Sequence, residues 1–365
     1  MHLAHIAFPQ KWKSLALEAG TYVVEDHNAA EILWEGRGFG QVRLEAASPP
    51  AFGGVVTMEA GQRLLVVRVG GFGDLLWLNS LYPAIREMGI KVYHCCFSRY
   101  ADVLRGFVDG VVPYPLLLSD ARMFNQVAWL ENSIEGSPCK DGEHPTERLA
   151  GLLGVSLPER LAAYKVFEDE RAAALAAFPR TDGVHRVCVQ IEASGGPKSY
   201  QAIFQAMAHI ARRGREIVVV GKSRRPWQEK VPPGVFDCTQ EGFSIRQSIA
   251  MLSTCDAVLA PDSVMSHAGG ALGIPVVGLY GPFDGASYLK SYPGAIPLQG
   301  RMACSPCWWH PRGSEFPPGQ PCEAEGNCLA LNKITPEFVA MMVERALGGS
   351  PGDIVKNNAD SNELN

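Results

Sequence analysis

Continuous apolar runs alternate with helix-period segments from about residue 63 onward. Residues 63–69 form an apolar run of strand length, and residues 74–87 then place leucine and isoleucine close to a helical period. Further strands are predicted at residues 90–96 and 108–113. Because strand–helix–strand alternation is typical of a parallel sheet with helices on both faces, this region predicts one Rossmann-like unit.

A second series of the same kind begins near residue 187, after an interruption at residues 140–185 that holds Ala-rich helical stretches. Strands are predicted at residues 187–191, 216–220, 257–260 and 275–280, and helices near 200–213, 244–253 and from about 263. Two consecutive α/β units of similar size predict an α/β protein with two Rossmann-like domains facing a cleft.

The two ends of the chain have a different character. Residues 1–58 hold short alternating runs and end in a Pro/Gly-rich linker, which is typical of a small β-containing appendage, whereas the tail is polar. We therefore expect four segments: an N-terminal appendage at 1–58, a first domain at 59–180, a second domain at 181–347 with a cysteine-rich loop at 300–330, and a disordered tail at 348–365.

Composition narrows the class of protein. The 365 residues suffice for about two large domains, and 47% hydrophobic residues exclude a disordered chain. The net charge of -5 argues against a general nucleic-acid binder. No apolar run is long enough for a membrane span and no secretory signal begins the chain, so we expect a cytoplasmic location. The ten cysteines are therefore expected to be reduced thiols or metal ligands.

The first motif lies between a predicted strand and helix, at residues 70–74. Gly71 and Gly73 allow a ligand to approach the backbone, and a helix N-terminus favours anions. A dinucleotide fingerprint fails here because its last glycine would be Leu76, and the second strand ends in His94-Cys-Cys instead of a ribose-binding acid. Asp74 is either a helix N-cap or a carboxylate that takes a proton from an attacking hydroxyl.

Two later loops have the composition of phosphate sites. The loop at residues 192–198 offers the hydroxyl of Ser194 and the ammonium of Lys198, with a solvated surface loop as the alternative. In the second loop, Asp262 or Ser263 caps a helix whose N–H groups would seat a diphosphate. His267 taken alone is more often structural than catalytic. The small residues at 268–270 permit close packing or close approach of a ligand.

Four cysteines fall within one Pro/Gly-rich loop, at Cys304, Cys307, Cys322 and Cys328. This spacing indicates a tetrahedral zinc or iron site, and four reduced thiols are the alternative. A zinc-ribbon contact to nucleic acid is disfavoured because the surroundings are not basic. The other six cysteines are expected to be small buried hydrophobes: Cys95, Cys96, Cys139, Cys188, Cys238 and Cys255.

Taken in order, the motifs resemble those of glycosyltransferase family nine, the heptosyltransferases, over residues 63–347. The matching segments are Arg68-Val-Gly-Gly-Phe-Gly-Asp74, Ser194-Gly-Gly-Pro-Lys198, Asp262-Ser-Val-Met-Ser-His267 and residues 273–282, and many members also carry a cysteine-rich loop. The resemblance implies a GT-B fold and inverting transfer from a nucleotide sugar, typically ADP-heptose, in lipopolysaccharide or glycan biosynthesis. It implies no catalytic metal.

The resemblance also implies roles for single residues. Asp74 matches the general base, Lys198 the lysine on the donor phosphates, and Asp262 a residue near the donor sugar. The expected substrate contacts are Gly71, Gly73, Ser194, Lys198, Asp262, Ser263, Ser266 and His267. One displacement that inverts the anomeric carbon needs one base and one stabilised leaving group.

Other functions stay open. Val264 stands where the family usually has glycine, which would suit a carbohydrate- or partner-binding protein that has lost turnover. Another nucleotide-sugar enzyme of GT-B fold, such as an epimerase-like hydrolase, is a further alternative. The acceptor would be a glycan, a lipid-linked sugar or a protein rather than a nucleic acid, and homo-oligomerisation is left open.

Overall fold

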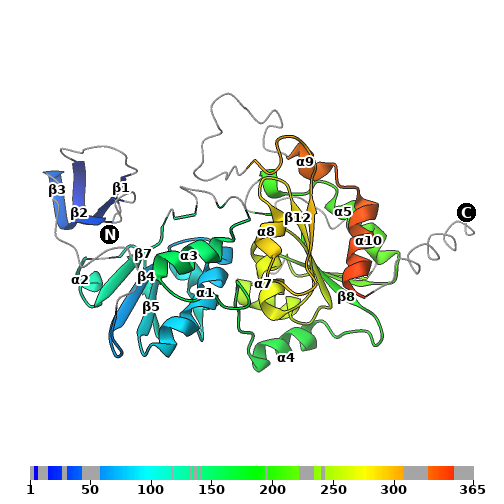
Figure 1. The fold of residues 1–365 in the computed structure, drawn as a ribbon, viewed down its shortest axis with the longest axis horizontal. Helices are drawn as coiled ribbons and strands as arrows, with labels where there is room; N and C mark the ends of the chain where they lie inside the picture. The colour runs from blue at the N-terminus through cyan, green and yellow to red at the C-terminus, as the bar shows by residue number, and fades with distance from the viewer. Residues whose placement is uncertain are drawn as a thin grey trace, which may run out of the picture. The chain divides into compact units, whose positions relative to one another are not determined.

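The computed structural model divides into two compact units. The first unit is Met1–Cys139 with Pro145–Pro158, and the second is Lys140–His144 with Glu159–Asn365 (Figure 1). The structure describes strands at 4–6, 15–26 and 31–42, and then residues 58–116, 118–131, 133–134, 139, 142–193, 196–221, 234–239, 243–307 and 328–348. Ser194, Cys322, the linker before residue 58 and the tail from 349 lie outside the described residues. The division into four segments stays a prediction.

Three strands form a sheet of their own near the N-terminus: β1 (Ala4–Ile6), β2 (Leu15–Asp26) and β3 (Glu31–Val42). The long strands β2 and β3 pair antiparallel, while β1 pairs parallel to β2. The alternating runs in this part of the sequence therefore correspond to strands.

A four-stranded parallel sheet organises the rest of the first unit, in the order β6-β5-β4-β7. Its strands are β4 (Arg63–Val67), β5 (Lys91–Cys96), β6 (Gly110–Pro113) and β7 (Gln126–Trp129). The helices are α1 (Phe72–Glu87), η1 (Ser98–Leu104), α2 (Leu118–Ala121) and α3 (Pro145–Leu153). Four successive residues of β4, from 64 to 67, are fully buried, which explains the continuous apolar run of this central strand.

The second unit holds a six-stranded parallel sheet in the order β10-β9-β8-β11-β12-β13. Its strands are β8 (Arg186–Gln190), β9 (Glu216–Val220), β10 (Val235–Asp237), β11 (Ala257–Pro261), β12 (Val276–Tyr280) and β13 (Ile296–Gln299). The chain builds outward from β8 in one direction and from β11 in the other. This is the doubly wound Rossmann order, in which ligands bind where the direction reverses.

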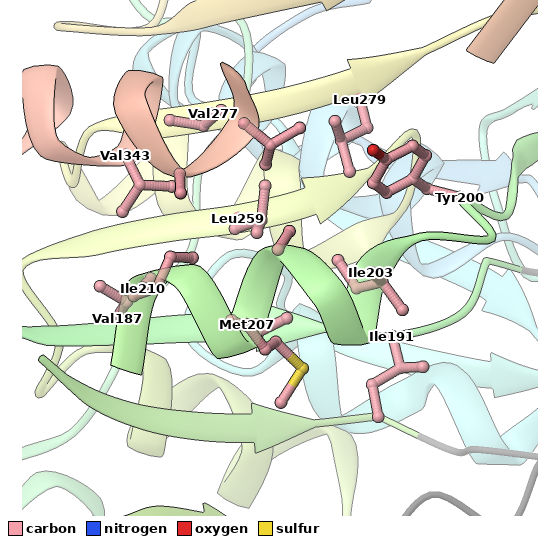
Figure 2. Close-up of a cluster of buried hydrophobic side chains, with 14 of the residues drawn as sticks. Val187, Ile191, Tyr200, Ile203, Met207, Ile210, Leu259, Val277, Leu279 and Val343 are labelled. Atoms are coloured by element: carbon pink, nitrogen blue, oxygen red, sulfur yellow. The ribbon is translucent and has the colours of Figure 1, made fainter. Parts of the chain in front are cut away.

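Helices cover this sheet: α4 (Glu168–Ala177), η2 (Gly196–Lys198), α5 (Ile203–Ala211), α6 (Ile245–Leu252), α7 (Val264–Leu272), α8 (Gly285–Leu289), α9 (Leu329–Asn332) and α10 (Pro336–Ala346). Figure 2 shows α5 lying on the sheet with Ile203, Met207 and Ile210, next to Val343 of α10. These side chains pack with strand residues such as Leu259 into one continuous core. Burial of this apolar surface is the main favourable contribution to the folding of the unit.

The predicted fold class is confirmed, since both units hold parallel sheets with covering helices. Strands β7, β10 and β13 were not predicted, because each has only three or four residues and no clear apolar pattern. Within the described residues, no helix has both the length and the apolar character needed to cross a membrane.

Candidate functional site

Each unit gathers its predicted site residues at the carboxyl ends of its central strands. In the first unit the order reverses between β4 and β7, and the Arg68–Asp74 motif directly follows β4. In the second unit the order reverses between β8 and β11, which are followed by Lys198 and Asp262 respectively. Parallel strands therefore bring motifs that are far apart in the sequence to one edge of each sheet.

An ion pair with unequal exposure is the centre of the first site. Nη2 of Arg68 lies 2.6 Å from Oδ2 of Asp74, and the two side chains are 2% and 19% exposed. Nη1 of the same guanidinium donates to the backbone oxygen of Leu130 at 3.3 Å. A buried cation thus holds a carboxylate that solvent still reaches.

The helix that carries Asp74 does not use it as a cap, and the N-cap alternative is wrong. Gly71 is the N-cap of α1, and Asp74 lies in the first turn, as does Gly73. Gly71 has a φ of 82°, and a Cβ at this position would overlap the Asp74 carboxylate. Glycine is therefore required at position 71 for its backbone conformation and for the space that the carboxylate occupies.

Two residues that sequence reasoning did not select support the turn between β4 and α1. The Val69 N–H donates to Oε2 of Glu131 at 2.8 Å, and Nε2 of His94 lies 2.9 Å from the backbone oxygen of Arg68. His94 belongs to the strand end that lacks a ribose-binding acid. Glu131 lies two residues after the end of β7, and because this strand was not predicted, no signal in the sequence indicated the place of Glu131.

A buried ion pair also marks the second site. Nζ of Lys198 lies 2.6 Å from Oδ2 of Asp262, with the side chains 10% and 6% exposed. The ammonium also lies 4.7 Å from the centre of the Phe283 ring, within the range of a cation–π contact. Lys198 is therefore not on a solvated surface loop, and its charge is balanced inside the unit.

His267 extends this pair. Its Nε2 lies 3.8 Å from Oδ1 of Asp262, and its Nδ1 lies 3.1 Å from the hydroxyl of Tyr292. Burial by itself would raise the pKa of Asp262, but the charge of Lys198 and the nearby imidazole of His267 outweigh it and hold this pKa well below its ordinary value. Asp262 is thus an anion over the whole physiological pH range.

The N-terminus of α7 is capped from the neighbouring strand. Ser263 is the N-cap residue rather than Asp262. Its hydroxyl donates to Oε1 of Gln190 at 2.5 Å, and the N–H of Met265 donates to the same oxygen at 3.4 Å. Ser266 donates its hydroxyl to the backbone oxygen of Ser263 at 2.6 Å. Gln190, a polar residue at the end of an apolar strand, was not selected from the sequence although that position was a usable signal.

The small residues of α7 serve packing. A Cβ on Gly269 would press against Val258 and Val276 of the sheet, and one on Gly270 would overlap the ring of Tyr292. These glycines let α7 lie close to β11 and β12, and they bring Tyr292 to His267. Of the two explanations for this segment, the structure supports close packing.

The cysteines separate into two groups. Cys95, Cys96, Cys139, Cys188, Cys238 and Cys255 are all buried, as predicted. In the loop, Cys304 is exposed, while Cys307 and Cys328 are half-buried. Burial raises the pKa of Cys328, and the nearby thiols of Cys307 and Cys304 raise it further. Among the described residues, which exclude Cys322, no three His, Cys, Asp or Glu side chains group so as to hold a metal ion.

Comparison with known families supports the resemblance. Residues 145–292 match the family model of glycosyltransferase family 9 (heptosyltransferase). This chain resembles the family 9 heptosyltransferases. The matched range includes Lys198, Asp262 and His267, while Asp74 and the cysteine-rich loop lie outside it. A comparison of the sequence with curated proteins found no match.

Solved structures of bacterial glycosyltransferases share the fold. The ADP-heptose lipopolysaccharide heptosyltransferase II of E. coli has 16% identity and a TM-score of 0.58 over 78% of this chain and 98% of its own. A family 9 glycosyltransferase from Veillonella parvula DSM 2008 has 15% identity and a TM-score of 0.62 over 81% of this chain and 100% of its own. The iron-containing dodecameric glycosyltransferase TibC of enterotoxigenic E. coli H10407 has 15% identity and a TM-score of 0.58 over 91% and 93%. The GT-B class of the fold is thereby confirmed.

Proposed function

We propose that this protein is an inverting glycosyltransferase that moves a heptose-like sugar from a nucleoside-diphosphate donor to a hydroxyl acceptor. The observation that carries the proposal is the buried cluster of Lys198, Asp262 and His267. It lies where the Rossmann sheet of the second unit reverses direction, inside the range that matches family 9. Nucleotides bind doubly wound sheets at this place.

Lys198 is the proposed cation for the donor diphosphate. The leaving diphosphate gains negative charge as the glycosidic bond breaks, so a buried ammonium stabilises the transition state more than the ground state. In the structure this charge is paired with Asp262. When the donor binds, a phosphate oxygen therefore has to contact Lys198 in place of, or together with, the Asp262 carboxylate. Asp262 can then accept hydrogen bonds from sugar hydroxyls.

Asp74 is the proposed general base. The acceptor oxygen forms a bond to the anomeric carbon, the bond from that carbon to the diphosphate breaks, and the acceptor proton passes to the Asp74 carboxylate. The partial exposure of Asp74 is consistent with access for an acceptor, and the guanidinium of Arg68 keeps the carboxylate in place. A separate acid is not required in this scheme, because the diphosphate leaves as an anion.

Two of the remaining predicted contact residues are proposed to hold the protein backbone in place and not to bind the substrate directly. The hydroxyls of Ser263 and Ser266 donate within the unit, so we assign them to holding the N-terminus of α7 toward the donor. The N–H of Val264, the first residue of that helix, is proposed for the diphosphate. Ser194 lies outside the described residues, and its place near the diphosphate stays a prediction, as do contacts of Gly71 and Gly73 with substrate.

ADP-heptose is the proposed donor. The similar E. coli protein is described as an ADP-heptose heptosyltransferase, and TibC has been solved in complex with ADP-D-β-D-heptose. TibC is also described as dodecameric. We therefore propose a homo-oligomer in solution. A glycan, lipid-linked or protein acceptor and a cytoplasmic location stay predictions.

The four loop cysteines are proposed to hold a structural zinc or iron ion. The nearness of the Cys304 and Cys307 thiols to that of Cys328 supports this. The described thiols do not by themselves form a metal group, and Sγ of Cys328 accepts the Leu331 N–H at 3.4 Å. Elemental analysis of the purified protein is expected to give about one equivalent of zinc plus iron. A content below about half an equivalent would remove the metal site.

Donor binding and turnover test the main proposal. ADP and ADP-heptose are expected to raise the melting temperature. A ligand at 100 times its dissociation constant should add about 2.7 kcal/mol to the free energy of unfolding. ADP-heptose is also expected to release ADP slowly when water replaces the acceptor. Binding without release would favour a carbohydrate-binding protein that has lost turnover, and no binding would contradict the proposal.

A further inference from the structure

A buried tyrosine and a buried histidine are linked by hydrogen bonds to the backbone of Arg68, the cation of the Arg68–Asp74 ion pair. Tyr82 on α1 and His94 on β5 are both 0% exposed. The Tyr82 hydroxyl lies 2.5 Å from Nδ1 of His94, and Nε2 of His94 lies 2.9 Å from the backbone oxygen of Arg68. The inference drawn from these hydrogen bonds rests on the proposed role of Asp74 as the base.

The two hydrogen bonds that join Tyr82, His94 and the Arg68 carbonyl allow one arrangement of protons. The Arg68 carbonyl only accepts, so Nε2 of His94 carries the hydrogen, Nδ1 accepts, and the Tyr82 hydroxyl donates. Burial lowers the pKa of His94 to about 4, and the charge of Arg68 lowers it as well. His94 is therefore neutral at physiological pH and acts as a fixed donor.

Arg68 is the residue at which the backbone leaves the sheet, and its position is held on several sides. Its N–H donates to the backbone oxygen of Cys95 at 3.3 Å, and its carbonyl accepts from His94. The next amide, of Val69, donates to Glu131. Fixing these groups fixes the root of the Arg68 side chain, and the guanidinium at its end contacts Asp74.

We propose that His94 is a positioning residue of the transfer reaction, which fixes the backbone of Arg68 so that its guanidinium fixes the carboxylate of Asp74. The alternative is that His94 only satisfies a buried carbonyl and contributes stability. Small displacements of a reacting group lower rates strongly, so the two alternatives differ in turnover and not only in unfolding.

Three substitutions separate them. His94→Leu removes the donor, whereas His94→Gln keeps an amide N–H near the place of Nε2. Asn79→Leu is the matched control, because Asn79 is also 0% exposed, lies on α1, the helix that carries Asp74, and donates from Nδ2 to a different carbonyl, that of Val103, at 2.9 Å. His94→Leu and Asn79→Leu both remove one buried hydrogen bond to a backbone oxygen, and His94→Leu also removes the acceptor of the Tyr82 hydroxyl.

Turnover is measured as ADP release from ADP-heptose with water as the acceptor, at a temperature where each variant is folded. His94→Leu is expected to lower kcat about 10- to 100-fold with an unchanged KM, and His94→Gln to restore it to within a few-fold. Asn79→Leu is expected to lower the melting temperature and leave kcat unchanged. Equal kcat values for His94→Leu and the wild type would overturn the inference.

Combining the substitution with Asp74→Asn tests the route of the effect. If His94 acts through Asp74, His94→Leu causes little further loss in the Asp74→Asn background. The same factor in both backgrounds would contradict the inference. An Asp74→Asn variant that turns over normally would instead contradict the proposed base, so the two failures are distinguishable.

A measurement without substrate covers the case in which turnover is too slow to follow. The side-chain carboxyl resonance of Asp74 is observed by ¹³C NMR and assigned with Asp74→Asn. We expect His94→Leu to shift this resonance and Asn79→Leu to leave it in place, and an unshifted resonance would overturn the inference. If His94→Leu does not fold, Tyr82→Phe, which removes the hydroxyl that orients His94, is expected to give the shift in its place.

Discussion

The two units each place an ion pair at the reversal point of a parallel sheet, but they expose it differently. In the first unit the cation is buried and the carboxylate of Asp74 is 19% exposed. In the second unit the side chains of Lys198 and Asp262 are only 10% and 6% exposed. The first arrangement presents an anion to an incoming molecule, whereas the second keeps a cation paired until a competing anion arrives. The same topology is therefore compatible with the proposed base in one unit and with the proposed phosphate site in the other.

Burial also determines what happens when one partner is lost. A carboxylate with access to water is partly solvated after its partner is removed, but a fully buried one is not. The second pair should therefore contribute to stability as a unit, and the first pair to the placement of a reactive group. The following predictions test this difference.

The largest effect is expected from Asp74→Asn. The amide keeps the size of the side chain but does not accept the acceptor proton, so ADP release from ADP-heptose should fall about 10²- to 10⁴-fold. The rate is measured with saturating ADP-heptose and compared with that of the Asn79→Leu control. A rate within threefold of the wild type would be incompatible with a base at this position.

Lys198→Met should separate the two pairs by stability. The substitution leaves the Asp262 carboxylate buried without its ammonium, which should lower the free energy of unfolding by about 3–5 kcal/mol. Arg68→Met leaves Asp74 with access to solvent, and its cost should be smaller, about 1–2 kcal/mol. Urea unfolding of both variants measures this. Equal losses would show that the difference in exposure has no energetic consequence.

The pH dependence of stability should reveal Asp262. Its pKa in the folded protein lies below the ordinary value, because Lys198 and His267 outweigh the opposing effect of burial. Its contribution is therefore complete above the unfolded pKa of about 3.9 and is lost as the pH falls toward the folded pKa. The difference in unfolding free energy between the wild type and Asp262→Asn should shrink as the pH falls from 5 to 2.5. A constant difference would argue against a depressed pKa.

Gly270→Ala should have a smaller effect than Lys198→Met, and only in the second unit. The added methyl group overlaps the ring of Tyr292, which bonds His267, so the helix or the ring has to move. We expect a loss of about 1–3 kcal/mol in stability, with ADP release per folded molecule within a few-fold of the wild type. Thermal unfolding and the release assay together check this. A loss of turnover without a loss of stability would mean that the glycine faces the donor.

The sequence predicted most of the α/β pattern because the central strands are buried on both faces and read as apolar runs. Strand β7 was not predicted, since Gln126-Val-Ala-Trp is short and begins with a polar residue. Glu131 was missed for the same reason, because its contact with Val69 depends on the strand order. Long-range pairing of this kind leaves no local signal in a single sequence.

The individual residues of the site were predicted from the sequence, but the contacts between them were not. Asp74, Lys198 and Asp262 were selected from glycine-rich loops and from the resemblance, but the loops of Lys198 and Asp262 meet only because β8 and β11 are neighbours. Arg68 was quoted as part of a motif without a role. His94 was noted for the acid that it replaces, whereas its function follows from the register of β4 and β5, which sets Val66 opposite His94.

Calorimetric titration of ADP tests the central claim, that the second unit binds the donor and the first supplies the base. The wild type and Asp74→Asn should bind ADP with affinities within a few-fold of each other. Lys198→Met, titrated at a temperature where it is folded, should bind about 10- to 100-fold more weakly, since a charge-assisted contact of about 1.5–3 kcal/mol is lost. Equal affinity of Lys198→Met and the wild type, or an equal loss in Asp74→Asn, would contradict this division of roles.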